Sequence, residues 1–186
     1  MAKPQTLKNV LHVGCGPKNP ELLDPMFRGP EWREIRLDID PDVQPDIVGS
    51  LTDMSQVSDA SMDALYSSHN LEHLHLFEVP GALREFYRVL KTGGIALIVV
   101  PDIQLVSKIV ANDGLEEKVY DSAAGPVRSI DIFYGFQKAL EEGKTFMAHK
   151  TAFTPRTLAE HLEEAGFQKG QTWNDRLDIR AIVQKL

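Results

Sequence analysis

An apolar run that stops at two glycines constrains the fold of this chain more than any other feature. Residues 8–13 are short and mostly apolar, as in a buried strand, and they lead into the turn Gly14-Cys15-Gly16-Pro17. The next such run, residues 34–39, carries Asp38 near its end, 22 residues after Gly16. Glycines let the backbone approach a ligand closely, and a carboxylate at the tip of the next strand can accept both hydroxyl protons of a ribose. This order predicts a site for a cofactor that contains a nucleoside.

The same turn disfavours a dinucleotide cofactor. The dinucleotide pattern Gly-x-Gly-x-x-Gly needs a third glycine beside the pyrophosphate, but the sixth position counted from Gly14 is Asn19. NAD is therefore disfavoured, although a nucleotide-binding enzyme such as a dehydrogenase stays open as an alternative. A Gly-x-Gly by itself is also compatible with a plain turn between a strand and a loop.

Strand and helix patterns alternate along the rest of the chain. Apolar runs predict further strands at 46–48, 62–68, 95–100, 167–173 and 177–185. An apolar stripe with helical spacing predicts a helix from Glu78 to before Gly93, and Thr154-Pro155 begins a second helix over 155–165. Between residues 19 and 28, Pro25 permits only a stunted helix.

This alternation predicts an α/β fold with a Rossmann-like, doubly wound, mostly parallel sheet. A chain of 186 residues is long enough for one domain with a sizeable core, so we expect a single domain over 1–186. Residues 103–150 have an irregular helical pattern and are expected to form an insertion or lid after the fifth strand. Ligands of such sheets bind at the carboxyl ends of the strands, near the point where the strand order reverses.

Charge and composition argue against several classes of partner. The formal charge is −7 and no run of basic residues is present, so neither nucleic acid nor an anionic membrane surface is an expected partner. The longest aliphatic run, residues 95–100, is far shorter than the roughly 20 residues of a membrane-spanning helix. The first residues lack the apolar core of a signal peptide, and the single Cys15 excludes an intramolecular disulfide framework. We therefore expect a cytoplasmic location.

Four blocks of the sequence occur in an order that matches a known family. They are Val10-Leu11-His12-Val13-Gly14-Cys15-Gly16, Arg36-Leu37-Asp38-Ile39-Asp40-Pro41, the segment from Met62 to Leu74, and Arg88-Val89-Leu90-Lys91-Thr92-Gly93-Gly94-Ile95. With them the chain resembles the class I S-adenosylmethionine-dependent methyltransferases, in particular their small bacterial, type-11-like members. The resemblance implies the class I architecture, with an antiparallel last strand, and S-adenosyl-L-methionine as the cofactor.

The resemblance also implies roles for individual positions in binding the cofactor. Backbone around Gly14, Cys15 and Gly16 would face its methionine part. Asp38 would hold the ribose and Ile39 would lie against the adenine. The remaining implied positions are Ser50 and Leu51, at the adenine amino group and ring, and Ser68, at the end of the fourth strand beside the methionine tail.

Three positions depart from the family pattern. The family usually has an acid at the position of His12, a glycine at that of Lys18, and often an aspartate at that of Ser50, for which Asp53 could substitute. These departures motivate an alternative function, in which a non-catalytic domain has kept the methyltransferase fold and binds a partner.

The expected reaction requires few particular side chains. Methyl transfer from a sulfonium is an in-line displacement, so the enzyme gains mainly by aligning the reacting atoms and excluding water. A hydroxyl or amine acceptor on a small molecule would need a base, for which His69 is our first candidate and His149 our second. His69 and His73 have the spacing of two helical metal ligands, but no third ligand follows at a compelling distance, and we expect no metal. The oligomeric state is not predicted.

Overall fold

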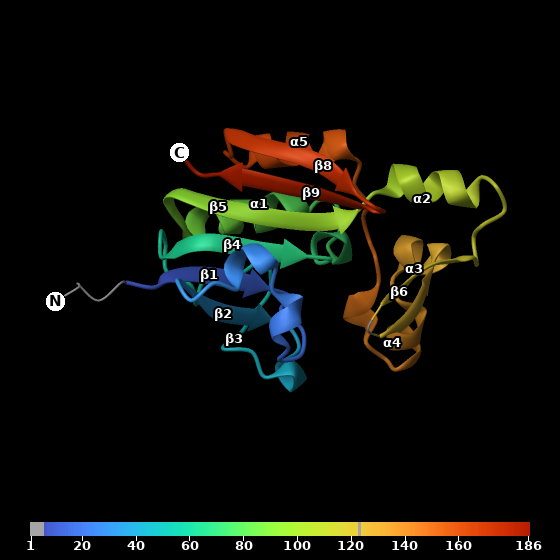
Figure 1. Cartoon of the computed structure of the whole chain (residues 1–186), viewed down its shortest axis with the longest axis horizontal. Coiled ribbons are helices and arrows are strands. Elements are labelled where there is room, and N and C mark those ends of the chain that lie inside the picture. The colour runs from blue at the N-terminus through green and yellow to red at the C-terminus, as the bar shows by residue number, and fades with distance from the viewer. Residues whose placement is uncertain (1–5, 123) are drawn as a thin grey trace.

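A seven-stranded sheet forms the centre of the protein. The structure is a computed structural model, and it describes residues 6–122 and 124–186. Within these residues the strand order is β3-β2-β1-β4-β5-β9-β8 (Figure 1). The strands are β1 (Lys8–Val13), β2 (Trp32–Asp38), β3 (Ile47–Val48), β4 (Met62–Ser68), β5 (Leu90–Pro101), β8 (Lys169–Asp175) and β9 (Asp178–Gln184).

The strand directions agree with the predicted fold class. Strands β1 to β5 pair in parallel, whereas β9 runs antiparallel to both β5 and β8. The order of the sheet reverses at β1, which has β2 on one side and β4 on the other. The carboxyl ends of β1, β2 and β4 therefore border the crevice where ligands of such sheets bind.

Two helices cover one face of this sheet. They are α1 (Val79–Val89) and α5 (Pro155–Glu164), and their apolar stripes include the buried side chains of Phe86 and Leu158. Both helices were predicted, but β5 begins at Leu90 rather than at residue 95, because Leu90 already pairs with Met62 before an irregularity in the register. No helix in the described part of the chain is long and apolar enough to cross a membrane.

The opposite face has a thinner cover. Instead of a full helix after β1, the chain forms two short 3-10 turns, Pro20–Leu22 and Pro25–Phe27. Each turn begins with a proline, and the side chains of Asn19 and Asp24 cap their starts. Leu23 and Phe27 pack on the sheet together with residues such as Tyr66. The predicted stunted helix is thus confirmed as two isolated turns.

The insertion after β5 is partly as predicted. Its helical elements are α2 (Ile103–Val110), α3 (Ser129–Tyr134), α4 (Gln137–Glu141) and a 3-10 turn at Thr145–Met147. The predicted irregularity of the helical pattern includes a hairpin that was not predicted, in which β6 (Lys118–Ser122) and β7 (Gly125–Arg128) pair antiparallel. Val106, Val127 and Ile132 form a small core for this unit. Figure 1 shows it beyond the carboxyl ends of β4 and β5.

Candidate cofactor and acceptor site

A cavity of about 760 Å³ lies at the carboxyl ends of the parallel strands. Gly14, Asp38 and Asn70 line it from the sheet. Phe136 and Phe146 line it from the insertion. A volume of this size is within the range of pockets that enclose small organic ligands, roughly 300 to 1,000 Å³. The insertion therefore forms a wall of the cavity, as a lid over a substrate would.

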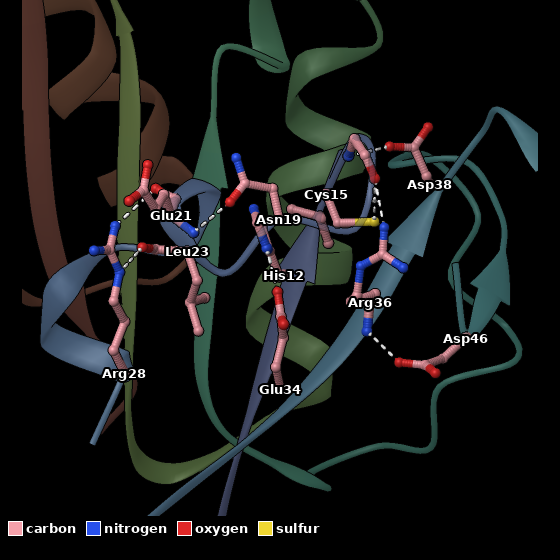
Figure 2. A network of polar contacts seen from close by, with 12 residues as sticks. His12, Cys15, Asn19, Glu21, Leu23, Arg28, Glu34, Arg36, Asp38 and Asp46 are labelled. Carbon is pink, nitrogen blue, oxygen red and sulfur yellow. Dashed lines mark hydrogen bonds and ion pairs between the residues drawn. The ribbon is translucent and has the colours of Figure 1, made fainter. Parts of the chain in front are cut away.

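The glycine turn after β1 is tied to the end of β2 through Asp38 (Figure 2). The backbone N–H of Gly16 donates to Oδ2 of Asp38 at 2.8 Å, and that of Asp40 donates to Oδ1 at 2.9 Å. Arg36 strengthens the link, since its guanidinium donates to the carbonyl oxygens of Gly16 and Gln44. Each carboxylate oxygen can accept more than one hydrogen bond, so Asp38 keeps acceptor capacity for ribose hydroxyls.

Asn70 joins the ends of β1 and β4, and sequence reasoning did not select it. Its Nδ2 donates to the carbonyl oxygens of Val13 at 2.9 Å and Ser68 at 3.0 Å. Gly14 has a φ of +59°, and a Cβ at this position would lie 1.7 Å from Oδ1 of Asn70. Glycine is therefore required here by both the backbone conformation and the side chain that packs against it. The only sequence signal for Asn70 was its place directly after His69.

Most of the positions predicted to bind the cofactor line the cavity. They are Gly14, Gly16, Asp38, Ile39, Ser50 and Leu51. Ser68 lies at the end of β4 but does not line the cavity. The side chain of Cys15 points away from it into the protein, where burial raises the pKa of the thiol to about 11. Cys15 is thus a small buried residue without a nucleophilic thiolate at neutral pH.

His69 lies in the cavity between two carboxylates. Its Nδ1 is 3.4 Å from Oε1 of Glu72 and its Nε2 is 3.5 Å from Oδ2 of Asp178. Burial lowers the pKa of His69, but the two carboxylates together outweigh it and raise the pKa to about 10. His69 is therefore an imidazolium at neutral pH in this arrangement. A φ of +55° holds it in the left-handed region, which is uncommon for residues other than glycine.

His149, the second predicted base, lies outside this cavity. It borders a smaller cavity together with Glu72 and Ile132, and its Nδ1 donates to the carbonyl oxygen of Ile132 at 2.7 Å. Burial lowers its pKa, so the ring is neutral. The structure brings His149 close to His73, with ring centroids 4.8 Å apart, rather than to the cofactor side of the large cavity.

The positions that depart from the family pattern differ in their surroundings. His12 is buried beneath the glycine turn, and its Nδ1 lies 2.7 Å from Oε1 of Glu34 (Figure 2). Neither His12 nor Lys18 lines the large cavity. Ser50 does line it, and its hydroxyl lies 2.9 Å from that of Thr52, whereas Asp53 is exposed and outside the lining.

Several solved structures with this architecture are methyltransferases. A SAM-dependent methyltransferase from Methanosarcina mazei is 18% identical with a TM-score of 0.62, over 98% of this chain and 94% of the other. One from Archaeoglobus fulgidus is 15% identical with a TM-score of 0.61, over 97% and 87%. The 1,6-didemethyltoxoflavin-N1-methyltransferase of Burkholderia thailandensis is 17% identical with a TM-score of 0.57, over 97% and 72%. These likenesses define the fold, a Rossmann-like sheet of the class I type.

The sequence comparison adds the family. Residues 11–98, which contain the second half of β1, strands β2 to β4 and most of β5, match the family model described as "Methyltransferase domain". Residues 11–98 thus match a methyltransferase domain, and together with the likeness to solved S-adenosylmethionine-dependent methyltransferases this match supports a class I methyltransferase. S-adenosyl-L-methionine is the cofactor of this class, and the resemblance seen in the four sequence blocks is confirmed. No curated protein sequence matches the chain.

The residues around the cavity fit this cofactor. Asp38 offers carboxylate oxygens at the tip of β2, and the side chain of Ile39 is 55% exposed, as an apolar support for an adenine ring would be. Gly14 and Gly16 line the cavity without a side chain, so a ligand can approach their backbone closely.

Proposed function

We propose that the chain transfers a methyl group from S-adenosyl-L-methionine to a hydroxyl or amine of a small molecule in the cytoplasm. The observation that carries this proposal is one cavity of about 760 Å³ that is lined both by the cofactor positions of β1 and β2 and by His69 after β4. Such a volume has room for a small acceptor beside the cofactor. The negative charge of the protein supports a small molecule rather than a nucleic acid as acceptor.

In this proposal the cofactor lies across the glycine turn. Asp38 accepts hydrogen bonds from the ribose hydroxyls, and Ile39, Ser50 and Leu51 surround the adenine. The backbone of Gly14 and Gly16, which both line the cavity, would hold the methionine part. The cofactor brings the sulfonium-bound methyl group, and the chain contributes binding and orientation of the two reactants.

His69 and the insertion act on the acceptor. The apolar side chains of Phe136, Phe146 and Met147 form a wall that excludes water from the reacting atoms. His69 lines the cavity in which the acceptor would bind, but both of its ring nitrogens face carboxylates, Nδ1 that of Glu72 and Nε2 that of Asp178. It becomes a base for the acceptor proton only when its contacts with Glu72 and Asp178 loosen.

A related fold supports a small acceptor. The Burkholderia thailandensis structure contains 1,6-didemethyltoxoflavin and S-adenosylhomocysteine, both small molecules. At 17% identity this comparison concerns the fold, so the acceptor of the present chain is to be found by experiment.

Calorimetric titration tests the proposal. Purified protein is titrated with S-adenosylmethionine and S-adenosylhomocysteine, with NAD as the control, and we expect micromolar binding of the first two alone. An acceptor screen with a labelled methyl donor then follows. Absence of binding at millimolar concentration would overturn the proposal and favour the non-catalytic, partner-binding alternative, while selective binding of NAD would favour a dehydrogenase.

A further inference from the structure

Three potential metal ligands come together between the large cavity and the insertion. Glu72 and His73 belong to a 3-10 turn, Leu71–His73, that follows β4. His149 lies near the end of the insertion, between the 3-10 turn at Thr145–Met147 and α5. One ligand atom from each of Glu72, His73 and His149 lies within 4.8 Å of the others, and we refer to these residues as the Glu72 cluster.

The carboxylate of Glu72 is buried with one ion-pair contact, to His69, and no hydrogen bond from the described residues. Glu72 is 1% exposed, and neither of its oxygens accepts a hydrogen bond from any residue that the structure describes. The nearest cation is Nδ1 of His69, at 3.4 Å from Oε1. Buried carboxylates are normally hydrogen-bonded, paired closely or bound to a metal. Beyond its contact with His69, this buried carboxylate therefore keeps acceptor capacity for a further ligand.

The two histidines present free nitrogen atoms. Nδ1 of His73 is 3.2 Å from the carbonyl oxygen of Ala148, and Nδ1 of His149 is 2.7 Å from that of Ile132. A carbonyl oxygen only accepts, so Nδ1 carries the proton in each ring and Nε2 has a free lone pair. Metal-bound histidines are typically held in this way, with a carbonyl or carboxylate on the other nitrogen.

The backbone also fixes the distance between the two segments. The carbonyl oxygen of Glu72 accepts hydrogen bonds from the N–H groups of Lys150 at 2.8 Å and Thr151 at 3.2 Å. His149 is therefore held next to the turn that carries Glu72 and His73. The ligand atoms already lie within 4.8 Å of one another, and a metal with bonds of about 2.1 Å brings its ligand atoms to within about 4.2 Å of one another.

We propose that the Glu72 cluster binds one divalent transition-metal ion through a carboxylate oxygen of Glu72 and Nε2 of His73 and His149. Two imidazoles and one carboxylate are a ligand set that suits zinc and similar ions, and three protein ligands leave a position open for water or another ligand. His73 also lines the large cavity, which gives the ion a path of entry. The bound ion links the insertion to the end of β4.

Metal binding is measured without reference to catalysis. Protein stripped with a chelator is titrated with Zn²⁺ by calorimetry, with Mg²⁺ as a hard-cation control, and Co²⁺ is added in parallel to record its visible absorption. We expect one Zn²⁺ per chain with micromolar or tighter affinity, no comparable binding of Mg²⁺, and the visible bands of Co²⁺ with nitrogen ligands. Binding of fewer than about 0.2 Zn²⁺ ions per chain would overturn the proposal and leave His69 as the partner of Glu72.

Variants assign the ion to this cluster. We expect Glu72→Gln, His73→Ala and His149→Ala each to weaken Zn²⁺ binding at least about 10-fold, whereas His75→Ala, at an exposed histidine of the same segment, leaves it unchanged. Because Glu72 is buried, Glu72→Gln is checked for folding by circular dichroism, and the partly exposed His149→Ala decides the question if Glu72→Gln does not fold. Equal Zn²⁺ affinity of His149→Ala and His75→Ala would place the ion elsewhere and refute the assignment.

Discussion

The contact between Gly14 and Asn70 allows a quantitative prediction. In Gly14→Ala, the new Cβ would overlap the Asn70 side chain, whose Oδ1 would be 1.7 Å away. Asn70 then has to leave, and its hydrogen bonds to the carbonyl oxygens of Val13 and Ser68 are lost. At about 1 kcal/mol for each bond and about 1 kcal/mol for alanine at a positive φ, Gly14→Ala lowers the free energy of unfolding by about 3 kcal/mol.

The partner substitution makes this prediction a double-mutant cycle. Asn70→Ala loses the same two hydrogen bonds without backbone strain, so it costs about 2 kcal/mol. In the double variant the overlap no longer exists, and the total cost stays near 3 kcal/mol instead of the additive value of about 5 kcal/mol.

Urea denaturation of the four proteins measures the coupling. We expect the two substitutions to be less than additive by about 2 kcal/mol, and the melting temperature of Gly14→Ala to fall by roughly 6 to 12 °C. Additive costs would refute the reasoning, because they would mean that Asn70 keeps its hydrogen bonds when alanine occupies position 14.

Four other predictions concern the site and its charges. We expect Asp38→Ala to weaken binding of S-adenosylmethionine on the order of 100-fold, because the cofactor loses hydrogen bonds to a charged carboxylate that contribute about 3 kcal/mol. Calorimetry measures this loss, and Asp42→Ala, at an exposed aspartate, is the control. His69→Ala should lower kcat more than it lowers affinity for the cofactor; an equal loss in both would place His69 at the cofactor instead. Since the pKa of Cys15 is raised to about 11 by burial, we expect a thiol reagent at pH 8 to label it slowly in the folded protein and fast in guanidinium, and fast labelling of both would contradict the buried position. Burial also lowers the pKa of His12, so the unfolded chain binds a proton below about pH 6.5 that the folded chain does not. The free energy of unfolding should therefore fall as the pH drops below that value. Urea titrations at pH 5.5 and 7.5 measure this fall, and His12→Gln should reduce it.

The sheet and the cofactor end of the cavity were predictable from local patterns. β1 and β4 have the predicted bounds because each is a short apolar run that ends where polar or glycine residues begin. Asp38 was found because its distance from Gly16 along the chain reflects one strand-turn-strand unit, and the two residues are indeed hydrogen-bonded. Such features depend on neighbours within one supersecondary unit.

The insertion and the Glu72 cluster depend on contacts that no local pattern records. The hairpin of β6 and β7 is short, and its second strand begins at Gly125, whose φ of +128° has no signal in the local sequence pattern. His149 meets Glu72 only because backbone hydrogen bonds hold Lys150 and Thr151 against the turn after β4. The spacing of histidines therefore suggested the pair His69 and His73, whereas the structure places His149 beside His73.

The short turns after β1 have a consequence for the charge of the cavity. A full helix at this place would direct the positive end of its dipole toward the ligand, but Pro20–Leu22 is too short to supply one. Lys138, Lys144 and Lys150, all from the insertion, are instead among the residues that line the cavity, and Nζ of Lys144 lies 4.0 Å from Oδ2 of Asp40. In a protein of net charge −7, these lysines thus place positive charge on the wall of the cavity that the insertion forms.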